Sequence, residues 1–468
     1  MKLRYFALIL LAAVPGFLFT SCKKEKKEEK NEVYDDFDKI KKAGELTVLT
    51  LSSSTSYFLY RELPMGFHYD IAKEFCKDHH LELKVKIGTS PLHLVKMLEE
   101  GEGDLIAYPL QILNEWKDSL IYCGLNTVSH QVLVQRNSGQ EAIKDVTELI
   151  GKKITVPKDS KFYQRLSNLN AELGGGIVIN TNIKDSLTTE DLIEMVANGD
   201  IDYTITDEYI GKLNKTYFRN INIDLPVSFD QRSSWAVSNS SVQLADSLNA
   251  WYSDNQKEPV YKAISKKYFE LSKLPFSEEF DLFKGLPKGQ ISPYDDLFKK
   301  YAKNIPYDWQ VLAGIAYQES RFKNGLTSWA GASGIMGVMP STARDQGMAD
   351  ADLMSPEVSI ELAVKVIRIL DKVLADIEDL DERLKFILAA YNGGIGHVMD
   401  MRALAKKYGD NDSLWEGNVR KWVTRKRYPE YYNDPVCKSG YFRGTETLNY
   451  VDEVVRITNR FKKETGNK

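Results

Sequence analysis

The order of strand-like and helix-like segments constrains the fold of this chain more than any other feature. The short β-rich run Glu45–Leu51 and the strictly alternating run Leu81–Ile87 predict β-strands, and apolar residues at helical spacing predict helices between them. The succession occurs twice within residues 44–275, the second time from about Lys152 to Asp207. Because strands that alternate with helices form α/β sheets, we expect two α/β lobes with a cleft between them.

After residue 291 the strand-like segments give way to apolar residues at helical spacing. This change predicts that residues 292–468 form a second domain, which is mainly α-helical. The segment before it is rich in Gly, Pro and Ser, so residues 276–291 are the expected linker. Ser292 should cap the first helix of this domain, with Pro293 at its first turn. A second helix should follow and place Glu319 near its C-terminal end.

Glu319 belongs to a dense motif that is far more specific than a single carboxylate. Its closely spaced glycines predict a tight loop, because glycine adopts backbone conformations that other residues avoid. The motif comprises Glu319-Ser320-Arg321-Phe322, Ser328-Trp329-Ala330-Gly331-Ala332-Ser333-Gly334-Ile335-Met336-Gly337-Val338-Met339-Pro340, Tyr391-Asn392-Gly393-Gly394 and Glu446-Thr447-Leu448-Asn449-Tyr450-Val451. These segments resemble the catalytic domain of lytic transglycosylases, lysozyme-like enzymes that cleave peptidoglycan. One departure is Gly337, where the family commonly has Gln.

The resemblance implies an enzyme that uses one carboxylic acid and neither a metal nor a cofactor. Glu319 would protonate the oxygen of the β-1,4 bond between N-acetylmuramic acid (MurNAc) and N-acetylglucosamine (GlcNAc). The muramoyl 6-hydroxyl would then close on C1 and form a 1,6-anhydro end. Apolar neighbours and the negative end of a helix both favour the protonated form of Glu319. The residues expected to bind the glycan are Ser320, Ser328, Met336, Tyr391, Asn392 and Tyr450.

Two alternatives for the second domain stay open at this point. A lysozyme-type muramidase, which is a hydrolase, would need a second carboxylate, and Asp345 and Asp350 are near the motif in sequence. A non-catalytic wall-binding or sensor lipoprotein would keep the fold without its chemistry.

The first module resembles the periplasmic solute-binding proteins of the amino-acid-binding class. The segments that carry this resemblance are Gly66-Phe67-His68-Tyr69-Asp70-Ile71-Ala72, Gly103-Asp104-Leu105-Ile106 and Gly199-Asp200-Ile201-Asp202-Tyr203-Thr204-Ile205-Thr206-Asp207. The resemblance implies that Asp207 meets the ligand ammonium and that Phe67 and Trp116 lie at the ligand site. Trp116 stands where an Arg usually clamps the ligand carboxylate, and an indole cannot form that bidentate contact. An amino-acid ligand, an ammonium-only ligand and a peptide-like ligand such as a muropeptide stay open, and so does an empty cleft that is retained for shape or regulation.

The first residues resemble a lipoprotein signal. A short basic start is followed by an apolar run over residues 5–20 and then by Cys22, which would carry the lipid. Residues 23–43 begin with a run of Lys and Glu that should form a solvated tether. The arrangement as a whole resembles the membrane-bound lytic murein transglycosylase F family. We therefore expect a protein anchored to the cell envelope by lipid, in the outer membrane and facing the periplasm.

Charge and cysteine content exclude several other classes. Without the signal, 60 basic residues stand against 66 acidic ones, because the removed segment carries two of the 62. This acidic balance argues against a nucleic-acid partner. Three cysteines remain besides Cys22, an odd number that rules out a fully paired disulfide framework. No spacing typical of metal ligands occurs.

Overall fold

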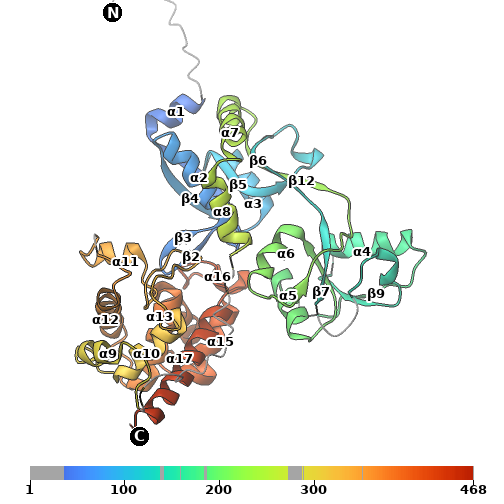
Figure 1. Ribbon diagram of the computed structural model, residues 1–468. Helices are drawn as coiled ribbons and strands as arrows, with labels where there is room; N and C mark the ends of the chain where they lie inside the picture. The colour runs from blue at the N-terminus through green and yellow to red at the C-terminus, as the bar shows by residue number, and fades with distance from the viewer. Residues whose placement is uncertain are drawn as a thin grey trace, which may run out of the picture. The chain divides into compact units, whose positions relative to one another are not determined.

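The computed structural model describes residues 36–137, 142–158, 160–183, 187–271, 273, 287, 289–349 and 351–466. Lobe 1 of the first module contains a five-stranded sheet with the order β4-β1-β5-β12-β6 (Figure 1). Strand β1 pairs in parallel with β4 and β5, whereas β12 runs antiparallel to β5 and β6. The elements of lobe 1 are α1 (Asp36–Ala43), β1 (Glu45–Leu51), β2 (Phe58–Tyr60), β3 (Leu63–Met65), α2 (Phe67–Asp78), β4 (Glu82–Gly88), α3 (Pro91–Glu99), β5 (Leu105–Gln111), η1 (Asn114–Trp116), β6 (Leu120–Ser129), β12 (Gln231–Ser238), α7 (Val242–Asn255) and α8 (Pro259–Phe269).

Lobe 2 is inserted between β6 and β12 of lobe 1. It contains a β10-β7-β11 sheet and a smaller β8-β9 sheet. An isolated bridge between Ile154 on β8 and Tyr203, just before β10, connects the two sheets. Its elements are β7 (Gln131–Arg136), η2 (Val146–Leu149), β8 (Lys153–Thr155), α4 (Lys161–Glu172), β9 (Val178–Asn180), α5 (Thr189–Asn198), β10 (Thr204–Asp207), α6 (Glu208–Lys215) and β11 (Ile221–Asn222). The expectation of two α/β lobes is confirmed.

A short hairpin, β2–β3, was not predicted. The register pairs Tyr60 with Leu63, so Arg61 and Glu62 form a two-residue loop. Both loop residues have positive φ, 50° and 64°, as a type I′ turn requires. Such turns prefer Asn-Gly, because side chains other than glycine cost roughly 1–2 kcal/mol per residue in this conformation. The tip of this hairpin is therefore strained.

The second domain is helical, as expected. Its first helix starts at Asp295 instead of Pro293, because Ser292 and Asp295 bond to each other and to main-chain N–H groups ahead of the helix. The elements are α9 (Asp295–Ala302), α10 (Trp309–Ser320), α11 (Pro340–Asp345), α12 (Pro356–Val373), α13 (Leu380–Gly393), α14 (Ile395–Lys407), η3 (Trp415–Val419), α15 (Arg420–Arg425), α16 (Pro429–Tyr432) and α17 (Thr445–Glu464).

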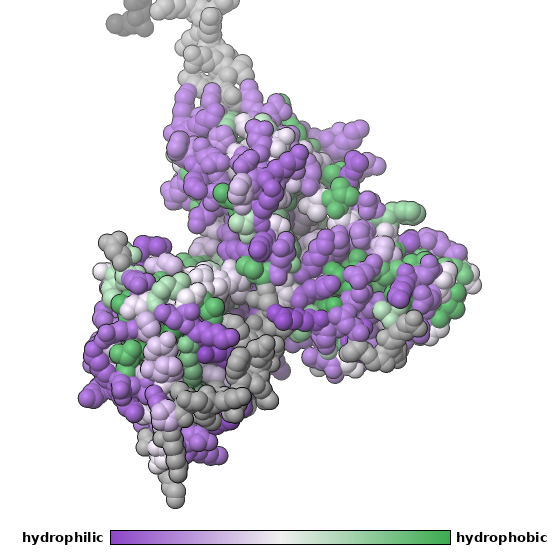
Figure 2. Space-filling model, viewed as in Figure 1, coloured by the Kyte–Doolittle hydropathy of each residue, from purple (hydrophilic) through white to green (hydrophobic). Residues whose placement is uncertain are grey.

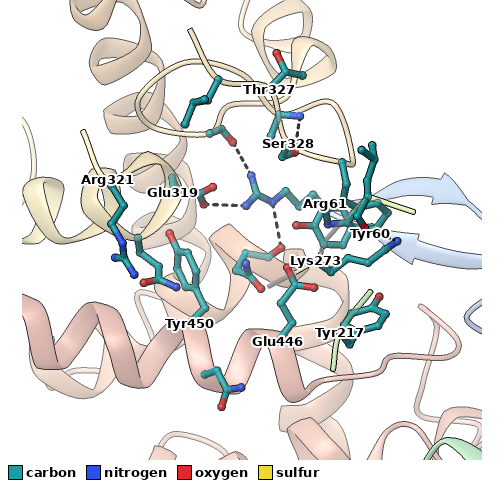
Figure 3. Close-up of a pocket in the computed structure, with 18 of the residues that line it drawn as sticks. Tyr60, Arg61, Tyr217, Lys273, Glu319, Arg321, Thr327, Ser328, Glu446 and Tyr450 are labelled. Carbon is teal, nitrogen blue, oxygen red and sulfur yellow. Dashed lines mark hydrogen bonds and ion pairs between the residues drawn. The ribbon is translucent and has the colours of Figure 1, made fainter. Parts of the chain in front are cut away.

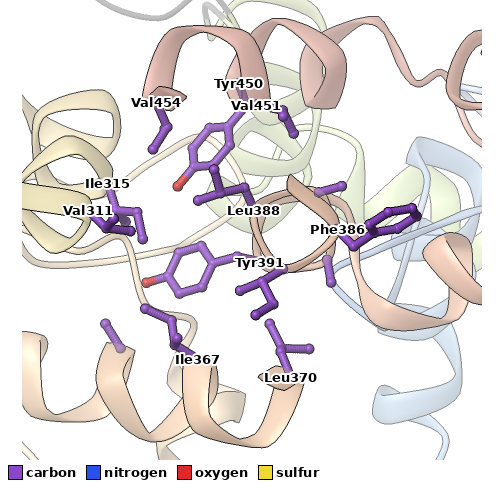
Figure 4. Close-up of a cluster of buried hydrophobic side chains, with 14 of the residues drawn as sticks. Val311, Ile315, Ile367, Leu370, Phe386, Leu388, Tyr391, Tyr450, Val451 and Val454 are labelled. Atoms are coloured by element: carbon purple, nitrogen blue, oxygen red, sulfur yellow. The ribbon is translucent and has the colours of Figure 1, made fainter. Parts of the chain in front are cut away.

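The core of the helical domain lies where α10, α12, α13 and α17 meet. Figure 4 shows apolar side chains from these helices converging around Leu388, with the rings of Tyr450 and Tyr391 on opposite sides of it. Burying side chains of this size contributes roughly 1.5–3 kcal/mol each. This packing fixes α10 and α17 beside each other and so determines where their polar ends point.

The surface of the described residues is mainly polar. On the face seen in Figure 2, hydrophilic residues dominate and hydrophobic ones occur in small separate groups. Within the residues that the structure describes, no helix is long and apolar enough to cross a membrane.

Candidate active site

A pocket of about 760 Å³ lies at the C-terminal end of α10, where the helical domain meets the first module (Figure 3). The helical domain supplies Glu319, Ser328, Asn392 and Tyr450. The first module supplies side chains as well. The lining residues from the module and the segment after it are Tyr60, Arg61, Tyr217, Phe218, Arg219, Leu271 and Lys273.

Glu319 occupies a wall of this pocket with 9% of its side chain exposed. It lies in the last turn of α10, which ends where Arg321 adopts the left-handed conformation. Burial raises the pKa of the Glu319 carboxyl above its ordinary value of 4.5, although the Arg61 guanidinium opposes this effect. A carboxyl in this position can stay protonated at a higher pH than a surface glutamate.

The predicted glycine loop lies against Glu319. Gly331, Gly334 and Gly337 all have positive φ, so the tight loop is confirmed. A Cβ atom on residue 337 would lie only 2.1 Å from Oε2 of Glu319. Glycine at position 337, where the family commonly has Gln, therefore has a steric consequence. It allows the Glu319 carboxyl to pack directly against the main chain of the loop.

Arg61 of the β2–β3 hairpin fills the centre of the pocket (Figure 3). Its Nη2 donates to Oε1 of Glu319 at 2.9 Å, its Nη1 to the carbonyl of Gly337 at 2.6 Å and its Nε to the carbonyl of Asn392 at 3.2 Å. Only 10% of the Arg61 side chain is exposed. Three acceptors from three segments of the helical domain thus hold one side chain of the other module.

The rest of the hairpin tip also contacts the helical domain. Glu62 accepts a hydrogen bond of 2.7 Å from the N–H of Gly396, in the first turn of α14. Burial holds the pKa of His397 well below its ordinary value, so its ring is neutral. Its Nε2 then donates to the carbonyl of Leu59 at 3.1 Å, while Nδ1 accepts from Lys426 at 2.7 Å.

Four of the expected glycan-binding residues lie at pockets around Glu319. Ser328 and Asn392 line the main pocket, where the Asn392 side chain accepts a 2.6 Å bond from Thr447. Tyr450 faces the Glu319 carboxyl. Burial is the main cause that raises the pKa of the Tyr450 hydroxyl, and the negative charge of Glu319 adds to it. Tyr391 lines a smaller pocket of about 140 Å³ across Arg61, and its hydroxyl donates to the carbonyl of Met336 at 2.7 Å.

The structure does not bring Ser320 and Met336 to the pocket, so their expected substrate contacts are corrected. The Ser320 hydroxyl is fully buried and lies 3.0 Å and 2.9 Å from the carbonyls of Ala316 and Ile335. The Met336 side chain is fully buried in the core. Both residues hold the loop that carries Gly337. Asp345 is exposed and lies away from the pocket, and Asp350 lies outside the described residues.

Besides Arg61, the sequence analysis did not predict three titratable side chains of the pocket, those of Glu446, Lys273 and Tyr217. Glu446 projects from α17 into it (Figure 3), and burial raises its pKa to about 7. Lys273 donates to carbonyls at the end of α8 and lies 4.8 Å from the Trp329 ring; burial lowers its pKa to about 7. Tyr217 packs under the guanidinium of Arg443 at 3.7 Å. Glu446 was part of a quoted motif, whereas nothing local marked the other two.

The predicted ligand residues of the first module are dispersed. Asp207 ends β10 and forms an ion pair with Lys161, whose Nζ lies 2.7 and 2.8 Å from its two carboxylate oxygens. Trp116 packs against the core under β5. Phe67 lines a separate cavity of about 820 Å³, between α6 of lobe 2 and α8 of lobe 1.

Lobe 2 is attached to the helical domain by buried ion pairs. Arg427 contacts Asp191 at 2.5 Å and Glu194 at 2.8 Å, both on α5. Arg443 contacts Glu190 at 3.2 Å, and Glu190 also bonds to Ser54 of lobe 1. Both lobes and the helical domain therefore meet at Glu190.

The described residues contain no group of three or more His, Cys, Asp or Glu side chains that could hold a metal ion. Cys22, the expected site of lipidation, lies outside the described residues.

Comparison with known families matches both modules. The family described as bacterial extracellular solute-binding proteins, family 3, matches residues 46–271, and the transglycosylase SLT domain matches residues 296–414. Two solved structures that resemble the first module are the L-cystine solute receptor of Neisseria gonorrhoeae (15% identity, TM-score 0.42, 50% of this chain and 95% of that one) and a substrate binding domain of Lactococcus lactis GlnP (18%, 0.42, 48% and 96%).

Full-length relatives extend these matches. The membrane-bound lytic murein transglycosylase F of Desulfosudis oleivorans is 30% identical over 417 residues, which cover 89% of this chain and 90% of that protein. The protein of the same name from Pseudomonas fluorescens (strain Pf0-1) is 29% identical and is covered to 85%. The chain thus combines a family 3 solute-binding module with a transglycosylase SLT domain. It belongs to the membrane-bound lytic murein transglycosylase F family.

Proposed function

We propose that this protein cleaves the β-1,4 bond between MurNAc and GlcNAc in peptidoglycan and leaves 1,6-anhydro-MurNAc ends. The observation that carries the proposal is Glu319, a carboxyl with raised pKa on the wall of a pocket that contains the motif residues Ser328, Asn392 and Tyr450. The names of the full-length relatives agree with this activity.

In the proposed reaction, Glu319 acts first as an acid and then as a base. Its proton passes to the glycosidic oxygen, and the C1–O bond breaks with its electron pair going to the GlcNAc oxygen. The positive charge at C1 is shared with the ring oxygen and steadied by the substrate's acetamido group. The muramoyl O6 then bonds to C1, and its proton returns to the Glu319 carboxylate. No water is consumed.

Mass spectrometry of digested peptidoglycan tests the product. Anhydro ends support the transglycosylase reaction, and reducing ends that carry ¹⁸O from labelled water contradict it. Glu319→Gln keeps the size of the side chain and removes its acidity, so it should abolish cleavage. Full cleavage by this variant would instead favour a non-catalytic wall-binding lipoprotein with a contaminating activity.

A muramidase hydrolase is the second candidate, because Glu446 provides a second carboxyl in the same pocket. In that case Glu446, and not the exposed Asp345, would activate the water. The same digestion experiment decides, and Glu446→Gln would abolish release of labelled reducing ends only in a hydrolase.

We propose further that the first module regulates the enzyme by keeping the pocket closed. The Arg61 guanidinium is bonded to the acid itself, so a glycan cannot place its scissile bond beside Glu319 until the hairpin leaves. Lobe 2 is fixed to the helical domain through Arg427 and Arg443, whereas lobe 1 carries the hairpin. A ligand that changes the angle between the lobes would therefore pull Arg61 out of the pocket.

The module's ligand is proposed to be a peptide-like wall fragment and not a free amino acid. Lys161 already provides an ammonium to Asp207, and Trp116 offers no guanidinium for a carboxylate. A thermal-shift screen separates the classes, since a ligand at about 100 times its dissociation constant stabilises by roughly 2.7 kcal/mol. Stabilisation by amino acids and not by muropeptides would refute this assignment.

The protein is proposed to be lipid-anchored through Cys22 in the outer membrane, facing the periplasm. The names of the relatives include the words membrane-bound, and no spanning helix occurs in the part of the chain that the structure describes. Cys22→Ala should release the protein into the soluble fraction of fractionated cells; retention in the membrane would contradict the anchor.

A further inference from the structure

The acceptors around Arg61 have a geometry that suits one kind of cation. A guanidinium is planar, and its charge is spread over three nitrogens that donate in fixed directions. Each of the three nitrogens of Arg61 has its own acceptor: the Glu319 carboxylate, the Gly337 carbonyl and the Asn392 carbonyl. An ammonium has its charge on one tetrahedral centre, so it cannot reach three acceptors arranged around a flat group in this way.

Aromatic rings complete this environment. The central carbon of the guanidinium lies 5.5 Å from the centre of the Tyr60 ring and 5.7 Å from that of Tyr391. Both distances fall within the range of cation–π attraction. Tyr60 leaves with the hairpin, but Tyr391 belongs to α13 and stays. The helical domain by itself therefore supplies one carboxylate, two carbonyls and one ring face.

We propose that the pocket beside Glu319 is a binding site for a planar, delocalised cation, and that Arg61 occupies it as a mimic of the charged state of the substrate. An oxocarbenium-like sugar is such a cation, with its charge shared between C1 and the ring oxygen. The main-chain carbonyls of Gly337 and Asn392 then stabilise the positive charge at C1. The assignment of these carbonyls to catalysis rests on the proposed function, whereas the cation site does not.

Preorganised dipoles directed at developing charge are among the strongest contributions to catalysis. Here they come from a loop and a helix end that are held rigidly. The Gly337 loop is fixed by the buried Ser320 hydroxyl and by the Tyr391 hydroxyl on Met336. The α13 end is fixed by the bond from Thr447 to Asn392. Neither carbonyl needs to reorient when the charge appears.

The test uses Arg61→Ala, which empties the site, and three small methylated probes at constant ionic strength: methylguanidinium, the ammonium cation methylammonium, and methylurea, which is neutral and matches methylguanidinium in size. Binding is measured by the thermal shift of the variant. We expect methylguanidinium to bind about tenfold more tightly than methylammonium, equivalent to one hydrogen bond of about 1.4 kcal/mol. Methylurea should bind least. The wild type, whose site is occupied, should show no selective shift.

Two further variants keep the test decisive. Arg61→Gly suits the positive φ and serves if the alanine variant is poorly folded. In Arg61→Ala with Glu319→Gln the charged acceptor is lost, so selectivity for methylguanidinium should fall. Equal binding of both cations, or the same selective shift in the wild type, would overturn the inference.

Inhibition of wall cleavage by methylguanidinium in Arg61→Ala separates the inference from the proposed function. Selective binding in a variant that cleaves no peptidoglycan would contradict the function and leave the cation site. Cleavage that methylguanidinium and methylammonium inhibit equally would contradict the cation site and leave the function.

Discussion

Arg61→Ala should convert a closed enzyme into an open one. The substitution removes three hydrogen bonds, one of which joins a charged pair that is about 90% buried. Removing one partner of a buried pair costs roughly 3–5 kcal/mol, and Glu319 can limit this cost by taking up a proton. Ala also keeps the strained turn that Gly would relieve, so the change reports on the side chain alone.

We take about 3 kcal/mol as the loss in docking energy at pH 7. Because 1.4 kcal/mol corresponds to a factor of ten, the fraction of molecules with an open pocket should rise on the order of 100-fold, up to full opening. The contacts of Glu62 with Gly396 and of Leu59 with His397 remain in the variant. They continue to hold the hairpin in place and so limit how far the open fraction rises.

The assay is the initial rate of solubilisation of purified peptidoglycan by the mature protein, with the products identified by mass spectrometry. Arg232→Ala is the matched control, because Arg232 is an exposed arginine on β12 of the same module. Arg61→Lys keeps the charge but not the planar fork, so its rate should lie between those of the wild type and the alanine variant. A rate for Arg61→Ala at or below that of the wild type would refute the closed-pocket interpretation.

Three other perturbations test the pocket and the attachment of lobe 2 to the helical domain. In the folded protein the pKa of Glu446 is raised to about 7 from 4.5, so the contribution of this carboxyl to stability is present below pH 4.5 and is lost as the pH rises through 7. In urea unfolding at pH 8, Glu446→Gln should therefore be up to about 3 kcal/mol more stable than the wild type. At pH 4.5 the variant should show no gain in stability. A similar gain at both pH values would contradict this. Gly337→Ala places a Cβ 2.1 Å from the acid, so adding it to Arg61→Ala should lower the cleavage rate roughly 100-fold, and an unchanged rate would show that Glu319 is free to move. Arg427→Ala leaves Asp191 and Glu194 facing the helical domain without their cation and should cost about 3 kcal/mol with faster amide exchange in α5; unchanged exchange would mean that lobe 2 is held by other contacts.

Local patterns in the sequence predicted several elements of both modules. The strand predicted at Glu45–Leu51 is β1, and the alternation after Leu81 is β4. The helix that carries Glu319 begins after Asp308 and ends just after the acid, as its apolar spacing predicted. These features depend on residues within a few positions of each other, and a periodicity of two or of 3.6 records them directly.

Several residues of the candidate site depend on contacts that no local pattern records. Ser320 belongs to the motif, yet its hydroxyl turns into the core because two buried carbonyls there need a donor. Asp207 ends a strand as predicted, but its carboxylate forms an ion pair with Lys161 of α4. Glu446 belongs to the motif segment of residues 446–451, but the motif did not mark it as a pocket residue. Only the packing of α17 against α10 and α13 brings its carboxyl into the pocket.

The sequence by itself determined the two modules, their order and the end of α10 at which the acid stands. The tertiary structure alone decided that this acid is bonded to Arg61, which lies 258 residues away in the chain. The physical reason is that secondary structure follows from the short-range periodicity of apolar residues, whereas an ion pair between modules follows from how two folded surfaces fit. A two-residue turn with the sequence Arg-Glu gives no local sign of the partner that offsets its strain.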